Sequence, residues 1–221
     1  GNPTVDELAV RPDAGESFAR FIEENRLSDK PIIALLPGSR LAEIHDNLKI
    51  MIEAASAFPA YQLVIAGAPG VSPDFYRPYV RKGEVSIVFG KTYRLLQQAR
   101  AALVTSGTAT LETALLRVPQ VVGYYMRGGR FTYAFFRSLI KVNYVSLVNL
   151  IADAPVVEEL LVHHFTAENA RRALAPLLDD TPQREAQLRG YEAMALRLGP
   201  AGAPQRAARL ILQALSTSDK K

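Results

Sequence analysis

The order of short apolar runs and helix-like segments constrains the fold of this 221-residue chain more than any other feature. The apolar runs are continuous rather than alternating, which is typical of strands buried on both faces of a parallel sheet. Segments with helical periodicity separate them, so we expect an α/β fold with helices on both faces of the sheet. The expected strands are residues 31–36, 62–66, 85–89, 101–105 and 120–123, and the expected helices 16–27, 42–58, 73–82, 92–99 and 108–116.

Beyond residue 155 the periodicity is helical only. We therefore expect an α/β domain over residues 1–154 and a C-terminal helical extension over 155–221 that packs on it. The first eight residues, GNPTVDEL, have the character of a loop and not of a signal peptide. With no initiator Met, the chain is expected to be a fragment, and a cleaved tag is the alternative. The expected helices of the extension are 156–162, 166–178, 182–198 and 203–215.

Composition excludes disulfide bonds, thiolate catalysis and a membrane-spanning helix from what this sequence encodes. The chain has no Cys, which rules out disulfides and thiolate catalysis. No apolar run approaches the roughly 20 residues that span a bilayer. The net charge of +4 is modest, and its distribution along the chain is more informative than its size.

The sequence LLPGSR, residues 35–40, stands where the first strand passes into a helix. Ligands bind at the carboxyl ends of parallel strands, where Gly38 allows close approach of the backbone. The helix start offers N–H groups, Ser39 a hydroxyl and Arg40 a guanidinium, a combination that suits a phosphate. The alternative is a Pro-Gly turn in which Ser39 is the N-cap and Arg40 is solvated.

A second loop, TSGTATLE, residues 105–112, follows the fourth strand. Ser106 and Thr108 are good cap residues next to Gly107, and Glu112 lies one helical turn beyond Thr108 on the same face. From there its carboxylate could accept hydrogen bonds from two ribose hydroxyls. Two such loops at one sheet edge favour a nucleotide diphosphate, whereas each alone could be a capped helix. The loops contain neither a P-loop nor a Gly-x-Gly-x-x-Gly sequence.

Other polar residues give weaker signals. His163 and His164 lack a third ligand at metal spacing, and His45 could be a surface residue, so we expect no metal site. Asn149 lies within the apolar sequence YVSLVNLIAD. It could be a satisfied amide in a core turn, or an amide that reaches a ligand at the sheet edge.

Residues 113–152 contain no Asp or Glu but carry several cations and many aromatic side chains. Such a segment can face an anionic substrate, a membrane surface or nucleic acid. Its aromatic residues lie close to helical spacing, which also suits a partly buried helix. The residues alone leave these three partners open. The basic residues are Arg117, Arg127, Arg130, Arg137 and Lys141.

These sequences, LLPGSR, SGTATLE, VVGYYM and YVSLVNLIAD, occur in an order and spacing that resembles the C-terminal half of lipid-A-disaccharide synthase. The resemblance covers essentially the whole chain, and YVSLVNL is its most specific part. It implies a GT-B fold of two Rossmann-like halves, of which this chain would be the half that binds the UDP-sugar donor. Such an enzyme transfers a diacylated glucosamine from UDP to a monosaccharide phosphate lipid and needs no metal or other cofactor.

The resemblance implies roles for individual residues. Gly38, Ser39 and Arg40 would contact the donor diphosphate. Ser106, Gly107 and Thr108 would belong to the UDP-sugar site. Glu112 would hold the ribose, and Asn149 would belong to the UDP-sugar site. The catalytic carboxylate belongs to the N-terminal half, so no catalytic residue is expected in this chain.

Two departures from the family pattern stand out. Tyr125 replaces a residue that is often basic, and Val162 replaces a Gln after Glu159-Leu160-Leu161.

The resemblance also implies partners and a location. The partners would be the UDP-sugar, the acylated sugar-phosphate acceptor and the N-terminal half, with no nucleic acid expected and a homodimer left open. The protein would be cytoplasmic and peripherally bound to the inner membrane through Arg127, Arg130, Arg137 and Lys141. Two alternatives stay open, namely another enzyme that uses UDP-GlcNAc (the peptidoglycan GlcNAc transferase or a 2-epimerase), and a non-catalytic binding module.

Overall fold

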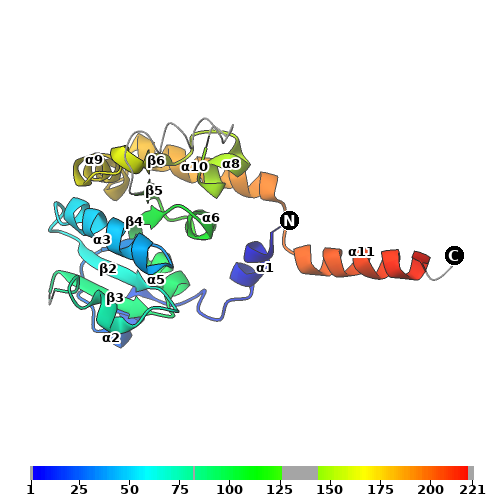
Figure 1. Ribbon diagram of the computed structural model, residues 1–221, viewed down its shortest axis with the longest axis horizontal. Helices are drawn as coiled ribbons and strands as arrows, with labels where there is room; N and C mark the ends of the chain where they lie inside the picture. The colour runs from blue at the N-terminus through cyan, green and yellow to red at the C-terminus, as the bar shows by residue number, and fades with distance from the viewer. Residues whose placement is uncertain (1, 82, 126–143, 219–221) are drawn as a thin grey trace.

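A six-stranded parallel sheet forms the centre of the molecule in the computed structural model, which describes residues 2–81, 83–125 and 144–218 (Figure 1). The strand order is β3-β2-β1-β4-β5-β6, and every pairing is parallel. This sheet confirms the predicted fold class. The strands are β1 Ile32–Leu36, β2 Gln62–Gly67, β3 Val85–Phe89, β4 Ala99–Thr105, β5 Gln120–Tyr124 and β6 Glu158–Leu161.

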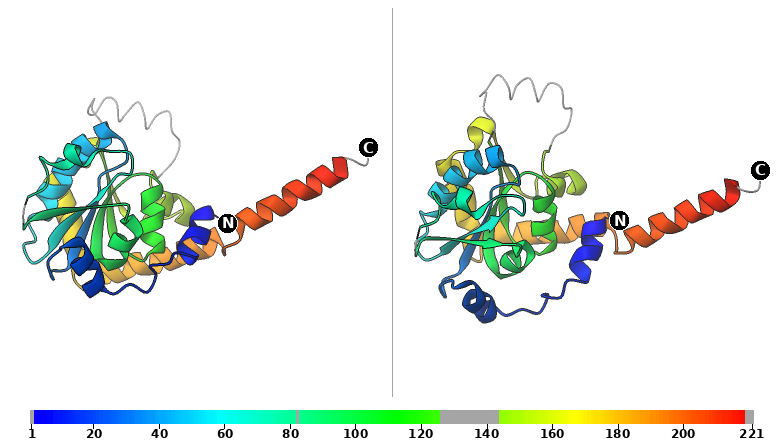
Figure 2. Two further views of the ribbon diagram at one scale, coloured as in Figure 1. Left: turned by 90° about the horizontal axis from the view of Figure 1, so that it is seen from below. Right: turned by 60° about the horizontal axis from the view of Figure 1, so that its bottom comes forward.

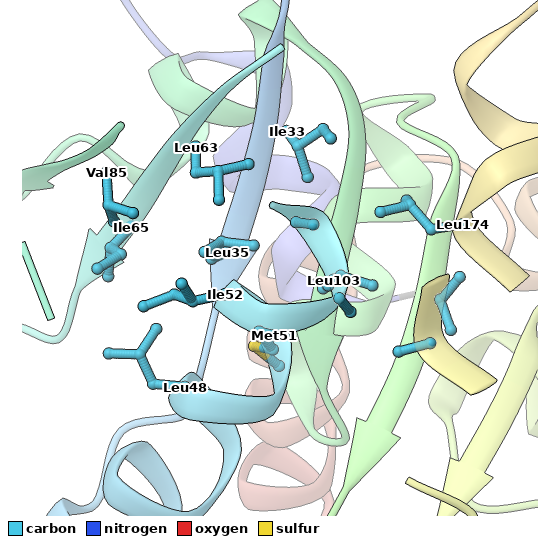
Figure 3. Packing of buried hydrophobic residues seen from close by; sticks show 14 of the residues in the cluster. Ile33, Leu35, Leu48, Met51, Ile52, Leu63, Ile65, Val85, Leu103 and Leu174 are labelled. Atoms are coloured by element: carbon cyan, nitrogen blue, oxygen red, sulfur yellow. The ribbon is translucent and has the colours of Figure 1, made fainter. Parts of the chain in front are cut away.

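Helices cover both faces, which explains why the strands are apolar throughout. On one face, Ile33 and Leu35 of β1 pack with Leu48 and Met51 of α3 (Figure 3). On the other face, Ile32, Ala34 and Leu36 belong to a separate cluster with residues of α2 and α5. The helices are α1 Pro3–Ala9, α2 Phe18–Asn25, α3 Leu41–Ala55, α4 Pro73–Tyr76, α5 Thr92–Gln98, α6 Thr108–Leu115, α8 Leu147–Ala152, α9 Ala167–Leu178, α10 Pro182–Leu198 and α11 Ala203–Ser218, with the short 3-10 helix η1 Val162–His164.

The structure corrects two expectations from the sequence. Residues 156–162 are not helical, because they contain β6, a strand paired in parallel with β5. Glu and Leu favour helices, and a four-residue strand is too short to show a strand pattern. The first residues are not a loop, because α1 starts at Pro3 and the Asn2 side chain accepts a hydrogen bond from the Thr4 N–H, 2.9 Å away.

The last helix, α11, extends away from the body of the molecule (Figure 2). Its start is held by α1, because the Asp6 carboxylate accepts hydrogen bonds from the N–H groups of Gly202 and Ala203. Leu210, Ile211 and Leu215 on this helix are exposed. Among the described residues, no helix has the length and apolar character needed to cross a bilayer.

Candidate functional site

A cleft of about 670 Å³ opens at the carboxyl ends of the central strands. Its walls come from the loops after β1, β2, β3 and β4, and from α1. The helix after β1 packs on one face of the sheet and the helix after β4 on the other, so this is the point where a doubly wound sheet binds its ligand. We call it the strand-end cleft. Its lining includes Glu7, Asp13, Gly38, Ser39, Glu43, Gly67, Lys91, Tyr93, Arg94, Ser106, Gly107, Thr108 and Glu112.

The loop after β1 is shaped by Gly38 and Glu43. Gly38 has φ +113°, and a Cβ there would lie 2.7 Å from the Glu43 carboxylate. Glu43 accepts a hydrogen bond from the Ser39 N–H at 3.3 Å and one from Arg40 Nη1 at 3.0 Å. Any side chain at position 38 would therefore strain the backbone and displace Glu43.

The structure places Arg40 at the rim rather than inside the cleft. Its side chain is 82% exposed and pairs with Glu43, and Arg40 is not among the lining residues. Arg40 rather than Ser39 is the N-cap of α3. The simple turn with Ser39 as N-cap is therefore not formed. Arg40 can reach a ligand only by releasing Glu43.

The second loop lies inside the strand-end cleft. Ser106, Gly107, Thr108 and Glu112 all line it, as the sequence predicted for one shared site. Gly107 is the N-cap of α6, so neither Ser106 nor Thr108 holds that position.

Three helices begin at this cleft, namely α3, α5 and α6, and no side-chain hydrogen bond caps the first turn of any of them. By contrast, Asn, Ser or Thr side chains cap α1, α2, α8, α9 and α10. Uncapped N–H groups at a helix start, with the positive end of the helix dipole, form an anion-binding arrangement.

Asn47 ties the two loops together, and sequence reasoning missed it. This buried side chain donates hydrogen bonds to the Pro37 carbonyl at 3.3 Å and to Thr105 Oγ1 at 3.0 Å. It also accepts one from the Tyr125 N–H at 3.0 Å. The sequence did carry a signal for Asn47, because this amide lies on the apolar stripe of α3 between Ile44 and Leu48.

Glu112 faces a phenol and a second carboxylate. Tyr93 and Glu7 line the strand-end cleft together with Glu112. Burial raises the pKa of Glu112, the nearby Tyr93 hydroxyl lowers it, and the Glu7 charge raises it. Burial and these two carboxylates also raise the pKa of Tyr93. The sequence analysis predicted neither Tyr93 nor Glu7 as a site residue. No motif in the sequence marks Glu7.

The cations that line the strand-end cleft are engaged by acids outside it. Lys91 Nζ lies 2.8 Å from Glu24, and Arg94 forms ion pairs with Glu16 and Glu24 at 2.5 Å. The lining carboxylates are Glu7, Asp13, Glu43 and Glu112. Within the described residues the cleft thus combines helix N–H groups for an anion with carboxylates for hydroxyl groups. A phosphorylated sugar or nucleotide has both features.

Asn149 lies outside this cleft. It is buried and donates to the Val157 carbonyl and to Glu159, both at 2.9 Å, and it accepts from the Val157 N–H at 2.9 Å. Its amide is satisfied within the fold, so the structure favours the core-turn alternative. Glu159 also accepts hydrogen bonds from Ser146, which ties β6 to α8.

The histidines give no sign of a metal site. His163 and His164 stack at 4.0 Å between ring centroids, and His45 Nδ1 lies 3.0 Å from Asp46. In the described residues, no group of three or more His, Cys, Asp or Glu side chains is placed to hold a metal.

The four predicted lipid contacts, Arg127, Arg130, Arg137 and Lys141, lie outside the described residues.

Sequence comparison relates the chain to a known enzyme family. The family described as lipid-A-disaccharide synthetase matches residues 1–207. Lipid-A-disaccharide synthase from Anaeromyxobacter sp. (strain K) is 36% identical over 212 residues, which cover 93% of this chain and 55% of that protein. The enzyme from Myxococcus xanthus (strain DK1622) is 35% identical over 221 residues, which cover 97% of this chain and 56% of that protein. The chain therefore spans about half the length of these curated relatives.

Solved structures with the same fold are more distant. A protein from Listeria monocytogenes assigned as a UDP-N-acetylglucosamine 2-epimerase superposes with a TM-score of 0.65 at 15% identity, over 99% of this chain and 53% of its own. The calicheamicin glycosyltransferase gives a TM-score of 0.54 at 18% identity, over 85% of this chain and 43% of its own. At such identities the likeness shows the fold alone, and it confirms the expected Rossmann-like half.

Proposed function

The chain belongs to the lipid-A-disaccharide synthase family, and we propose that it is the part of such a glycosyltransferase that binds the UDP-sugar donor. The donor is UDP-2,3-diacylglucosamine, and the whole protein transfers its acylated glucosamine to a lipid monosaccharide 1-phosphate with release of UDP. The carboxylate base and the acceptor site belong to the half that the relatives possess and this chain does not match.

One observation carries the assignment of the donor site. Two helices with uncapped starts, α3 and α6, meet in one cleft at the strand ends. Their N–H groups suit the diphosphate, and they stabilise its charge as UDP leaves. Glu112, one turn into α6, lines the same cleft and is proposed to accept hydrogen bonds from the ribose hydroxyls.

The diphosphate enters a loop that already holds an anion. The Glu43 carboxylate accepts a hydrogen bond from the Ser39 N–H and forms an ion pair with Arg40. A phosphate that binds there releases Arg40 from Glu43, and the guanidinium then closes over the phosphate with charge-assisted hydrogen bonds. Arg40 is thus proposed as a rim residue that contacts the ligand only when the cleft is filled.

The proposal also covers the location of the protein and its oligomeric state. Both sugar substrates carry acyl chains, so the protein is proposed to work at the cytoplasmic surface of the inner membrane, bound peripherally. Homodimer formation also stays a proposal.

Calorimetry with UDP, UMP and pyrophosphate tests the donor site. The chain should bind UDP more tightly than UMP. Gly38→Ala should abolish or strongly weaken UDP binding, because a Cβ there meets Glu43 at a positive φ. Gly70→Ala is the matched control, since a Cβ at Gly70 has no atom within 4 Å. Equal UDP affinity in the two variants would refute the assignment of this loop to the diphosphate.

Arg40→Ala probes the rim contact in the same assay. Loss of one charge-assisted hydrogen bond costs about 1.5–3 kcal/mol, or roughly 10- to 150-fold in affinity. Arg40 must first leave Glu43, so we expect a loss near 10-fold. Arg77→Ala, another exposed arginine in an i,i+3 ion pair, is the control. Unchanged UDP affinity in Arg40→Ala would remove Arg40 from the site.

A further inference from the structure

We infer that the Thr105 hydroxyl is a further hydrogen-bond donor of the strand-end cleft, and that the buried Asn47 amide is the positioning residue that turns its proton toward a bound phosphate. The inference rests on the proposed donor site and deepens it. It adds a side chain at the end of β4 to the backbone N–H groups at the starts of α3 and α6.

Two backbone groups fix the orientation of the Asn47 amide. The Tyr125 N–H can only donate, so the amide oxygen faces it at 3.0 Å. The Pro37 carbonyl can only accept, so the amide nitrogen faces it at 3.3 Å. A flipped amide would set two donors against each other on one side and two acceptors on the other. The nitrogen therefore donates its second proton to Thr105 Oγ1, at 3.0 Å.

This hydrogen bond determines what the Thr105 hydroxyl can do. Its oxygen accepts from Asn47, so its own proton needs a different acceptor. Among the described residues, the hydroxyl donates to no group. Thr105 is only 4% exposed, and a buried donor without an acceptor is costly. Because Thr105 lines the strand-end cleft, a ligand bound there can supply the acceptor.

The place of Thr105 in the sheet favours a phosphate oxygen as that acceptor. Thr105 is the last residue of β4, two residues before the start of α6 at Gly107. In the neighbouring strand, Leu36 pairs with Val104, so the hydroxyl stands at the sheet edge beside the loop that leads into α3. A ribose hydroxyl could also accept a proton, but two uncapped helix starts on either side favour an anion.

Calorimetric titration of the chain with UDP and with pyrophosphate tests the donor role. Thr105→Val removes the hydroxyl at nearly constant volume and should weaken the binding of both ligands about 10-fold, the lower end expected for a hydrogen bond to a charged group. Thr105→Ser keeps a hydroxyl and should recover most of the affinity. Thr113→Val is the matched control, because this buried hydroxyl donates to the Ala109 carbonyl at 2.7 Å.

A double-mutant cycle separates donation to the ligand from the contact between the two side chains. In Asn47→Asp an ionised carboxylate accepts but does not donate, so the contact is kept while its direction is reversed and the Thr105 proton is withdrawn from the ligand. Adding Thr105→Val should then cost no further pyrophosphate affinity, compared with about 10-fold in the parent. The new charge is present on both sides of that comparison. A purely structural contact would cost the same in both backgrounds.

Proton NMR gives a second readout that a structural role would not move. The Thr105 hydroxyl proton, identified by its displacement in Thr105→Ser, should shift downfield and exchange more slowly when pyrophosphate is added. Uridine brings no phosphate and should leave this resonance in place. A shift of the same size with uridine would overturn the assignment of the hydroxyl to a phosphate.

The outcomes separate this inference from the proposed function. If the parent binds neither UDP nor pyrophosphate, the proposed donor site is wrong and the inference falls with it. If the parent binds both and Thr105→Val binds them equally well, the donor site stands and the inference is refuted. A cost of Thr105→Val that persists in Asn47→Asp refutes the positioning role. If either of these variants does not fold, the NMR experiment decides, and a hydroxyl resonance that pyrophosphate leaves unchanged overturns the inference.

Discussion

At the scale of single residues, one buried amide controls the relative position of the two ligand loops. Asn47 bonds to the end of β1, to the end of β4 and to the residue after β5. The Asn47 side chain has no exposed surface, so solvent water does not reach the groups to which it is hydrogen-bonded. The cleft therefore depends on a residue that does not line it.

Asn47→Leu should lower the free energy of unfolding by about 2–4 kcal/mol. The new side chain matches the neighbouring apolar surface, but it leaves the Thr105 hydroxyl, the Tyr125 N–H and the Pro37 carbonyl without their partner, and each such buried group costs about 1–3 kcal/mol. Urea denaturation measures the change. Lys49→Ala, an exposed position on the same helix, should stay within about 0.5 kcal/mol of the parent. A similar small change in Asn47→Leu would show that the loops do not depend on the amide.

At the scale of elements, α5 is anchored to the N-terminal part of the chain by charge. Arg94 on α5 pairs with Glu16, before α2, and with Glu24 on α2. The Arg94 hydrogen bond lowers the pKa of Glu16, and hydrogen bonds from Arg94 and Lys91 lower the pKa of Glu24 to about 2. Lys91 and Arg94 line the cleft, whereas their acidic partners Glu16 and Glu24 lie outside it.

The cluster should make stability depend on pH in a defined window. Because the folded pKa values are depressed, the stabilisation is complete above the unfolded carboxyl pKa of about 4.3 and is lost as the pH falls toward 2. Arg94→Gln should therefore be less stable than the parent at pH 7, and the difference should shrink between about pH 5 and pH 2. Urea denaturation at several pH values measures it, with the exposed pair variant Arg77→Gln as control. A difference that stays constant across this window would contradict the ion-pair account.

A glycine on β5 sets how closely the C-terminal elements pack on the sheet. A Cβ at Gly123 would lie 2.2 Å from the buried ring of Phe165, between η1 and α9. Gly123→Ala should lower the free energy of unfolding by about 1–3 kcal/mol through overpacking. The double variant Gly123→Ala/Phe165→Leu should recover part of the loss, measured in a double-mutant cycle. Additive losses would show that ring and backbone do not interact there.

The first five strands were predictable because they are short apolar runs bounded by Gly or Pro, and four of them, β1, β2, β4 and β5, are mostly buried. The helix 182–198 was also placed correctly. The strand β6 was not predictable, since its four residues, EELL, pair only with β5 at the sheet edge and carry helix-favouring side chains. The loops at residues 38–40 and 106–112 were predicted as one site, because strand ends of a parallel sheet share an edge. Glu7 and Tyr93 reach that site only through tertiary packing, which no local pattern encodes.

At the scale of the whole molecule, the basic residues predicted to bind lipid lie outside the described part, so that contact stays a prediction from sequence. Each basic residue near an anionic leaflet is worth about 1 kcal/mol. The triple change of Arg130, Arg137 and Lys141 to Gln should therefore reduce co-sedimentation with anionic vesicles at low salt. The matched control changes Arg171, Arg172 and Arg189, exposed residues of α9 and α10, to Gln. If the two triple variants co-sedimented equally, the positive charge of residues 127–141 would not be the cause of vesicle binding.

The position of β1 between β2 and β4 has a consequence for how the chain reaches its native state. Leu35 of β1 pairs with Ile65 of β2 and with Leu103 of β4, so β4 joins from more than twice the sequence distance. Nearby contacts form sooner than distant ones, which favours early assembly of β1 with β2 and late docking of β4. The two ligand loops stand on β1 and β4. The proposed capacity to bind a nucleotide should therefore arise late in folding. Bound nucleotide should then slow unfolding without speeding the early phase of refolding.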